Sequence, residues 1–210
     1  MLANISGRKL RLGNKKYIKE LFEINKFRLK HNLAAYDNGK INKDLCKQIV
    51  FNALLLNEIQ WTEKFIEKYT PLLFEEYQES MKNLAKACIY FNTKKYNDVL
   101  VSLNKFEFKD ITDKITVKNL IARTYYEMKE FELLVYHLDS TKHFLKNNKN
   151  LSSYLSEVNS IFFNYLYSIV TAVENNDSKK IIKLEESIRN GSAFNDKIWL
   201  LEKIAEKILQ

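Results

Sequence analysis

Proline and glycine are scarce in this chain, whose 210 residues contain one proline and four glycines. The many tight turns of an all-β domain draw on these two residues, so their scarcity argues against that fold class. Leucine, lysine, glutamate and alanine, which favour helices, are instead plentiful and recur at helical spacing. The composition therefore predicts an all-α fold.

Cysteine is scarce as well, and the two that occur, Cys46 and Cys88, both fall inside expected helices. These positions favour buried, small apolar side chains over a disulfide or a reactive thiol. A chain without a disulfide framework fits a reducing compartment, so we expect a cytoplasmic location.

Long apolar runs are missing. The most apolar segment covers residues 161–173 and contains Asn164, which leaves it far short of the roughly 20 apolar residues of a membrane span. The first residues reach Arg8 and Lys9 before the apolar core of a secretory signal can form. We therefore expect neither a membrane span nor a secretory signal.

Recognisable catalytic motifs are missing too. His31, His137 and His143 stand at no metal-ligand spacing, and the chain contains no serine-hydrolase, Walker or dinucleotide-binding signature. The acidic runs at residues 75–79 and 185–186 are typical of exposed helix faces. The sequence predicts a protein that is not an enzyme and has no cofactor and no metal site.

Positive charge is concentrated at one end. The net charge is +8, and residues 1–31 hold nine lysines or arginines against two glutamates, whereas the remainder is nearly balanced. Such an excess favours either attraction to nucleic acid or an acidic partner, or simply a solvated lysine-rich end. The candidate basic patch consists of Arg8, Lys9, Arg11, Lys15 and Lys16.

Two stretches of the chain match one another at a distance of 35 residues. Each has an apolar stripe at helical spacing, a short polar turn and a second apolar stripe, which predicts a helix hairpin. A shift of 35 residues toward the N-terminus also matches Tyr96 to Trp61. The matching positions in the two clear copies are Ala87, Tyr90, Phe91, Tyr96 and Leu103 in one and Ala122, Tyr125, Tyr126, Phe131 and Leu138 in the other.

This pattern predicts about five antiparallel helix hairpins in a single helical-repeat domain that covers residues 14–210. The clearest repeats cover residues 44–140, and longer, atypical helices follow in residues 141–210. Residues 1–13 lack helical periodicity and contain two glycines, so we expect a flexible basic lead-in there.

Individual helix starts are also predicted. Thr70 and Pro71 form an N-cap and first-turn pair, which predicts a helix start near Pro71. Thr112 or Asp113 is predicted to cap the helix that covers residues 114–129.

The two clear copies resemble the tetratricopeptide repeat over residues 44 to about 140. In that family a small residue lets paired helices approach closely, and an aromatic residue opens the second helix. The resemblance implies a right-handed α-solenoid whose first helices line a concave groove for a peptide or partner protein. The whole chain also resembles uncharacterised bacterial helical-repeat proteins rich in Lys, Asn, Tyr and Phe, a resemblance that implies no activity.

The groove positions of the family fall on a small set of residues. Arg123 and Asn119, four residues apart on one helix face, are expected to clamp a carboxylate or a peptide backbone. The alternative is that Arg123 pairs with a neighbouring acid and Asn119 faces water, and that Tyr90, Phe91, Tyr125 and Tyr126 serve in the core. The predicted partner-binding residues are Asn57 (as the equivalent of Asn92), Cys88, Asn92, Asn119, Arg123, Tyr126 and Glu127.

The sequence thus favours a non-catalytic scaffold that binds a protein or peptide. Two alternatives stay open: a nucleic-acid-binding repeat protein that uses the basic first 31 residues, and the C-terminal capping part of a longer repeat array.

Overall fold

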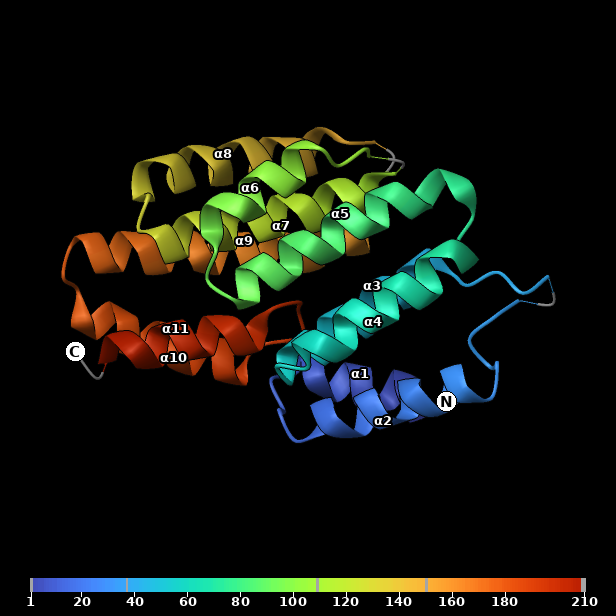
Figure 1. The fold of residues 1–210 in the computed structure, drawn as a ribbon. Helices are drawn as coiled ribbons and strands as arrows, with labels where there is room; N and C mark the ends of the chain where they lie inside the picture. Colours follow the sequence, from blue (N-terminus) through green and yellow to red (C-terminus); the bar gives the residue numbers. More distant parts are fainter. Residues whose placement is uncertain (1, 37, 109, 150, 209–210) are drawn as a thin grey trace. The chain divides into compact units, whose positions relative to one another are not determined.

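The computed structural model describes residues 2–36, 38–108, 110–149 and 151–208, and helices make up most of them (Figure 1). Within these residues, β pairing is limited to an isolated antiparallel bridge between Ala35 and Ile41. The all-α prediction is confirmed. The helices are α1 (Leu2–Arg11), α2 (Tyr17–Lys30), α3 (Lys43–Leu55), α4 (Ile59–Tyr69), the short 3₁₀ turn η1 (Thr70–Leu72), α5 (Glu75–Asn92), α6 (Tyr96–Asn104), α7 (Ile111–Met128), α8 (Phe131–Asn147), α9 (Ser153–Glu174), α10 (Ser178–Asn190) and α11 (Lys197–Ile208).

The described chain divides into two compact units. Unit 1 contains the residues up to Ser6 together with Lys16–Thr124, and unit 2 contains Gly7–Lys15 together with the residues from Tyr125 onward. The boundary near residue 124 falls inside α7, so this helix contributes to both units. The single repeat domain over residues 14–210 stays a prediction.

Helix α1 occupies a stretch where the sequence predicted no helix. The prediction of a flexible lead-in rested on Gly7 and Gly13 and overlooked the amphipathic spacing of residues 2–11. The helix is also tied to α2, because Ser6 is buried and its hydroxyl donates a hydrogen bond of 3.0 Å to Glu20. Met1 lies outside the described residues.

The helix predicted to start within a few residues of Pro71 is α5, which begins after a short 3₁₀ turn. Thr70 and Pro71 form the 3₁₀ turn η1, after which Leu73 is extended with φ −74° and ψ 160°. Helix α5 therefore begins only at Glu75 and carries Glu75 and Glu76 in its first turn, where acidic side chains complement the helix dipole. Pro71 fits the start of a 3₁₀ turn as well as that of an α-helix, which is why the sequence did not separate the two.

The predicted N-cap of α7 is also corrected. Neither Thr112 nor Asp113 caps this helix; the carboxylate of Asp110 accepts hydrogen bonds from the Asp113 backbone N–H (2.9 Å) and from the Thr112 hydroxyl (2.7 Å). Asp113 follows three residues later, inside the first turn, and its carboxylate binds lysines of another helix. Asp residues suit both tasks, so residue type alone did not distinguish them.

Four helix hairpins share one turn geometry (Figure 1). In each hairpin a left-handed residue stands one or two positions after the last residue of the first helix, which lets two backbone N–H groups bond back to the last carbonyls of that helix. In the α5/α6 hairpin, for example, Lys94 N–H bonds to the Phe91 carbonyl (3.1 Å) and Lys95 N–H to the Tyr90 carbonyl (2.8 Å). The left-handed residues are Asn57 (φ 59°), Lys94 (60°), Lys129 (61°) and Asn176 (51°).

This shared turn fixes the register of the repeat. Lys94 and Lys129 are 35 residues apart, in agreement with the predicted period. Asn57 and Lys94, however, are 37 apart, so Asn57 corresponds to Lys94 and not to Asn92. By the same alignment Tyr96 corresponds to Ile59, the first residue of α4, and the predicted match to Trp61 is two residues out of register.

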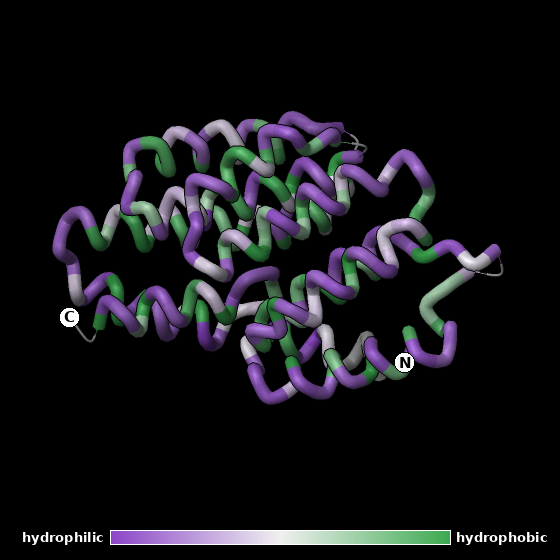
Figure 2. The backbone as a smooth tube through the Cα atoms, in the orientation of Figure 1, coloured by the Kyte–Doolittle hydropathy of each residue, from purple (hydrophilic) through white to green (hydrophobic). Residues whose placement is uncertain are grey.

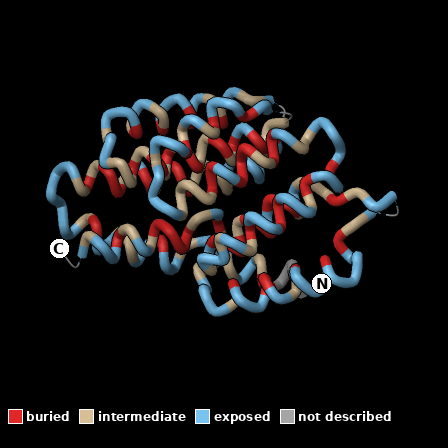
Figure 3. The backbone as a smooth tube through the Cα atoms, viewed as in Figure 1, coloured by how far each residue is buried: buried red, intermediate tan, exposed pale blue. Residues whose placement is uncertain are grey.

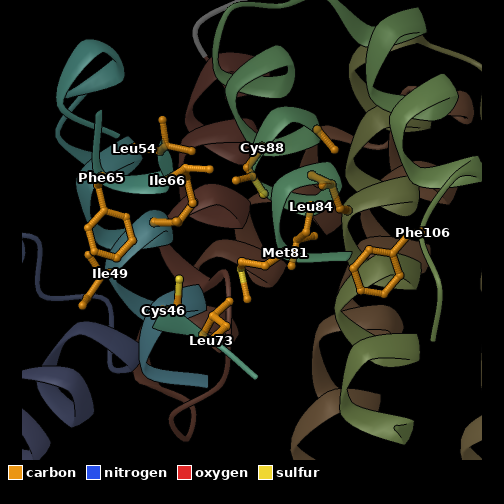
Figure 4. Packing of buried hydrophobic residues seen from close by; sticks show 14 of the residues in the cluster. Cys46, Ile49, Leu54, Phe65, Ile66, Leu73, Met81, Leu84, Cys88 and Phe106 are labelled. Carbon is orange, nitrogen blue, oxygen red and sulfur yellow. The ribbon is translucent and has the colours of Figure 1, made fainter. Parts of the chain in front are cut away.

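The core of unit 1 is built from α3, α4 and α5. Helix α3 packs against α2, α4 and α5, and α5 packs against α6. Cys46 and Ile49 of α3 and Ala87 of α5 are completely buried. Figure 4 shows how the apolar side chains of this cluster point toward one another, from Cys46 and Ile49 across Leu84 to Phe106.

The core of unit 2 is built around α9, which packs against α8, α10 and α11. Leu166 of α9, Ile188 of α10, and Leu200 and Ile204 of α11 are fully buried. Apolar and polar residues alternate around each helix (Figure 2), and the buried residues follow the apolar stripes (Figure 3). Helical periodicity therefore explains which side of each helix faces the core.

Candidate functional site

The two cysteines lie in the core of unit 1, as the sequence predicted. Both are thiols outside any disulfide, and both are buried. Burial raises the pKa of Cys46 to about 12, so this thiol is inert at neutral pH. Cys88, predicted to line the groove, is 7% exposed and points into the apolar cluster next to Leu84 (Figure 4).

The predicted groove residue Asn92 holds two helices together. Its side-chain amide donates a hydrogen bond of 2.8 Å to the Leu54 carbonyl in the last turn of α3. That carbonyl also accepts a hydrogen bond from the Asn57 backbone N–H in the turn (3.0 Å), so Asn92 adds a second bond at the end of α3. Asn57 is exposed and provides the left-handed turn residue between α3 and α4.

Asn119 and Arg123 lie on one face of α7 within unit 1, and both are half-buried. The guanidinium carbon of Arg123 lies 4.4 Å from the ring centre of Phe91 on α5. A guanidinium over an aromatic face is attracted to it and is held in a defined plane. The structure thus places Arg123 of α7 against Phe91 of α5, and the binding role of Arg123 and Asn119 stays a prediction.

Tyr126 and Glu127 belong to unit 2 and contact α11. The Tyr126 ring is buried and meets Trp199 edge-on, with ring centres 5.4 Å apart. Burial, with the nearby charges of Glu127 and Glu206, raises the pKa of Tyr126 above its usual range. The Glu127 carboxylate accepts a hydrogen bond from the Trp199 indole (3.0 Å) and pairs with Lys203 (3.0 Å).

The most extensive buried charge cluster was not predicted from the sequence. We call it the lysine–aspartate cluster: Lys43 and Lys47 of α3 with Asp44, Asp110 and Asp113. Lys47 is 2.9 Å from Asp113 and 2.8 Å from Asp44, and Lys43 is 3.0 Å from Asp113 and also pairs with Asp110. The side chains of Lys47 and Asp113 are only 7% and 5% exposed. The one signal in the sequence was the spacing of four residues between the two lysines.

The lysine–aspartate cluster is electrostatically satisfied. Burial raises the pKa of the Asp110 carboxyl, but hydrogen bonds from Lys43, the Asp113 backbone and Thr112 outweigh it and hold that pKa well below its usual range. Burial lowers the pKa of Lys43, and its bonds to Asp110 and Asp113 outweigh this and raise it. Both shifts favour the charged forms of Asp110 and Lys43, so these ion pairs act as a tie between α3 and the start of α7.

Lys197 of α11 is a second buried lysine. Its described hydrogen bonds all go to backbone carbonyls. Its ammonium donates to the carbonyls of Arg189 (3.2 Å) and Gly191 (2.9 Å) at the end of α10. A cation is favourable there because the C-terminal end of a helix is negative, although burial lowers the pKa of Lys197. Its role is to close the end of α10.

The predicted basic patch is exposed at Arg8, Lys9 and Arg11 in the last turn of α1. Lys15 instead pairs with Glu202 of α11 at 2.6 Å, so its charge is partly neutralised. Lys16 is exposed and its ammonium lies 5.3 Å from the ring centre of Tyr17.

The described residues contain no group of three histidine, cysteine or acidic side chains arranged to hold a metal ion. In the same part of the chain, every helix is too short or too polar to cross a membrane. In comparisons with known proteins, no family model, no curated protein and no solved structure matches this chain.

Proposed function

We propose that the chain is a non-catalytic, tetratricopeptide-like helical-repeat scaffold that binds a protein or peptide. The observation that carries the proposal is the turn shared by four hairpins, with a left-handed residue at Asn57, Lys94, Lys129 and Asn176. One turn used four times is what an array of equivalent helix pairs requires. On this proposal the hairpins stack in a right-handed α-solenoid.

The proposed contact surface is the face of α7 that carries Asn119 and Arg123, together with Phe91 of α5. Arg123 offers a planar, permanently charged group whose plane the Phe91 ring fixes at 4.4 Å. An amide one helical turn away supplies both a donor and an acceptor. This combination suits a carboxylate, such as a peptide C-terminus or an acidic side chain, next to an extended backbone.

Selection of random peptides displayed on phage against the immobilised chain tests this proposal. We expect enriched peptides to carry a carboxylate and to lose roughly tenfold or more in affinity to the Arg123→Ala variant, the loss expected for one charge-assisted hydrogen bond. Asn119→Ala should weaken the same peptides. Lys114→Ala, an exposed change on the same helix, is the matched control and should bind as the parent does. Peptides that bind all variants equally would contradict the proposed surface.

Nucleic-acid binding is the second candidate, and the exposed Arg8, Lys9 and Arg11 in the last turn of α1 favour it. Contacts to phosphate release counterions, so affinity for a DNA or RNA oligonucleotide should fall steeply between about 50 and 200 mM salt. Peptide binding on α7 should change little over that range. Reversal of the three charges that left oligonucleotide affinity intact would exclude this candidate. A role as the capping end of a longer array is compatible with either function.

A further inference from the structure

Two asparagine–glycine pairs occur in the chain, Asn38–Gly39 and Asn190–Gly191. In such a pair the glycine nitrogen can attack the side-chain carbonyl carbon of the asparagine, because glycine has no Cβ to hinder the approach. The product is a five-membered succinimide ring, which forms only if the backbone of the asparagine rotates out of a regular helix. Whether a given pair reacts therefore depends on how firmly the fold holds it.

The Asn38–Gly39 pair lies exposed between α2 and α3, within unit 1. The Lys40 backbone N–H donates a hydrogen bond of 3.0 Å to Oδ1 of Asn38, which folds this side chain over the Gly39 peptide group. The same N–H is placed to stabilise the negative charge that develops on Oδ1 during the attack. Gly39 has φ 75° and, its chain neighbours apart, no described heavy atom lies within 4 Å of the place that a Cβ would occupy. The Asn38 side chain is thus folded toward the glycine in open space.

One described hydrogen bond opposes the attack on Asn38. The Gly39 N–H donates to the Tyr36 carbonyl (2.8 Å), and the nitrogen must lose this proton to react. An exposed turn opens locally at a small cost in free energy, because few buried contacts are lost with it. This bond therefore slows the reaction without preventing it.

The Asn190–Gly191 pair, within unit 2, is held on both sides. Asn190 is the last residue of α10, so its backbone is helical. The buried ammonium of Lys197 binds the carbonyls of Arg189 (3.2 Å) and Gly191 (2.9 Å), which flank the pair. A Cβ on Gly191 would lie 2.8 Å from the carbonyl oxygen of Ser187, so this glycine is enclosed. Ring closure at Asn190 requires the end of α10 to unwind and these bonds to break.

We propose that Asn38 is a site of spontaneous deamidation in the folded protein and that the fold protects Asn190 from the same reaction. The Gly39 nitrogen gives up its proton and bonds to Cγ of Asn38, while the bond from Cγ to the side-chain nitrogen breaks and ammonia leaves. Water, the only co-reactant, then opens the succinimide. Hydrolysis at Cγ gives aspartate, and hydrolysis at the backbone carbonyl carbon gives isoaspartate, in which the chain continues through Cγ.

The modification changes the turn in which it occurs. The Tyr36 N–H donates to the Lys40 carbonyl (2.7 Å), and the Ile41 N–H that follows donates to the Leu72 carbonyl of η1 (2.9 Å). Isoaspartate adds a methylene group to the backbone between Tyr36 and Lys40, so the bond that joins them no longer fits the length of the turn. Both products also add a negative charge. We therefore expect the modified loop to be held less firmly against η1.

The test is peptide mapping by mass spectrometry after the full chain has been incubated in mildly alkaline buffer, where the glycine nitrogen loses its proton more readily. Deamidation replaces ammonia by water, so it raises the mass of the peptide that contains the modified asparagine. We expect the peptide with Asn38 to gain this mass at least about tenfold faster than the peptide with Asn190, because α10 must unwind before Asn190 reacts. Separation of aspartate from isoaspartate by chromatography identifies both products.

Incubation of the same chain in urea is the matched control, because unfolding removes the contacts of both pairs. There the two peptides should gain mass at similar rates. Asn38→Gln keeps the amide but lengthens the side chain by one methylene group, which disfavours ring closure, and it should remove the mass gain at this position while the helical content stays that of the parent. An unmodified Asn38, a gain at Asn190 as fast as at Asn38 in the folded chain, or the same ratio of rates in urea as in buffer would each overturn the proposal.

Discussion

The side-chain amide of Asn92 on α5 donates a 2.8 Å hydrogen bond to the Leu54 carbonyl at the end of α3. Asn92→Ala should therefore destabilise the fold by about 1 kcal/mol, the usual net contribution of such a bond. The free energy of unfolding in urea measures it. Asn97→Ala, at an exposed position on α6, is the control and should change that free energy little. Equal losses in the two variants would mean that the contact with α3 contributes nothing.

The lysine–aspartate cluster predicts a larger effect. Asp113→Asn keeps the shape of the side chain but leaves the buried Lys47 and Lys43 short of negative charge, so we expect a loss of about 3 kcal/mol in unfolding free energy. Asp44→Asn removes the other partner of Lys47, but Asp44 is 56% exposed, so the loss should be about 1 kcal/mol or less. Similar losses of unfolding free energy for the two variants would show that burial of the aspartate does not decide how much each ion pair stabilises the fold.

The same cluster predicts a dependence of stability on pH. The Asp110 pKa is lower in the folded chain than in the unfolded chain, so the unfolded state binds the proton first as pH falls. The contribution of Asp110 is complete above its unfolded pKa of about 4 and is lost as the pH falls through the folded value. We expect the free energy of unfolding, measured in urea at several values between about pH 5 and pH 2, to change less steeply with pH in Asp110→Asn than in the parent.

The sequence predicted the positions of the helices better than it predicted the roles of the polar side chains on them. Periodicity predicted the α5/α6 and α7/α8 hairpins because apolar stripes must face a core, and it gave the 35-residue spacing between Lys94 and Lys129. The prediction missed α1. The hydrogen bond from Ser6 to Glu20 that ties α1 to α2 joins residues that are distant in sequence.

The candidate site was harder to predict, for a physical reason. A polar residue on a helix binds a ligand or another helix with the same atoms, and only the fold decides between these partners. Asn92 bonds to the end of α3, and Glu127 binds Trp199 and Lys203. Arg123 lies over Phe91, a contact that leaves its predicted role in binding open.

The shared hairpin turn predicts stabilising substitutions. Lys94 has φ 60°, a conformation that costs most residues about 1 kcal/mol relative to glycine. Lys94→Gly should therefore raise the unfolding free energy by about 0.5 kcal/mol, after the greater freedom of glycine in the unfolded chain is subtracted. Lys95→Gly removes the same charge one residue later, where φ is −89°, and should destabilise the fold. Lys129→Gly should repeat the gain in the next hairpin. A loss at Lys94 equal to that at Lys95 would contradict the left-handed turn.

The contacts of Tyr126 predict opposite outcomes for two neighbouring residues. The Tyr126 hydroxyl is buried and has no hydrogen-bond partner among the described residues, so its removal relieves a desolvation cost while the ring keeps its contact with Trp199. Tyr126→Phe should leave the unfolding free energy unchanged or raise it by about 1 kcal/mol. Glu127→Gln removes the charge that pairs with Lys203, whose side chain is 13% exposed, and should lower the unfolding free energy by about 1–3 kcal/mol. Urea unfolding monitored by tryptophan fluorescence measures both changes. A large loss for Tyr126→Phe would instead show that the hydroxyl binds a group inside unit 2, such as an ordered water, and that Tyr126 contributes polar contacts as well as packing.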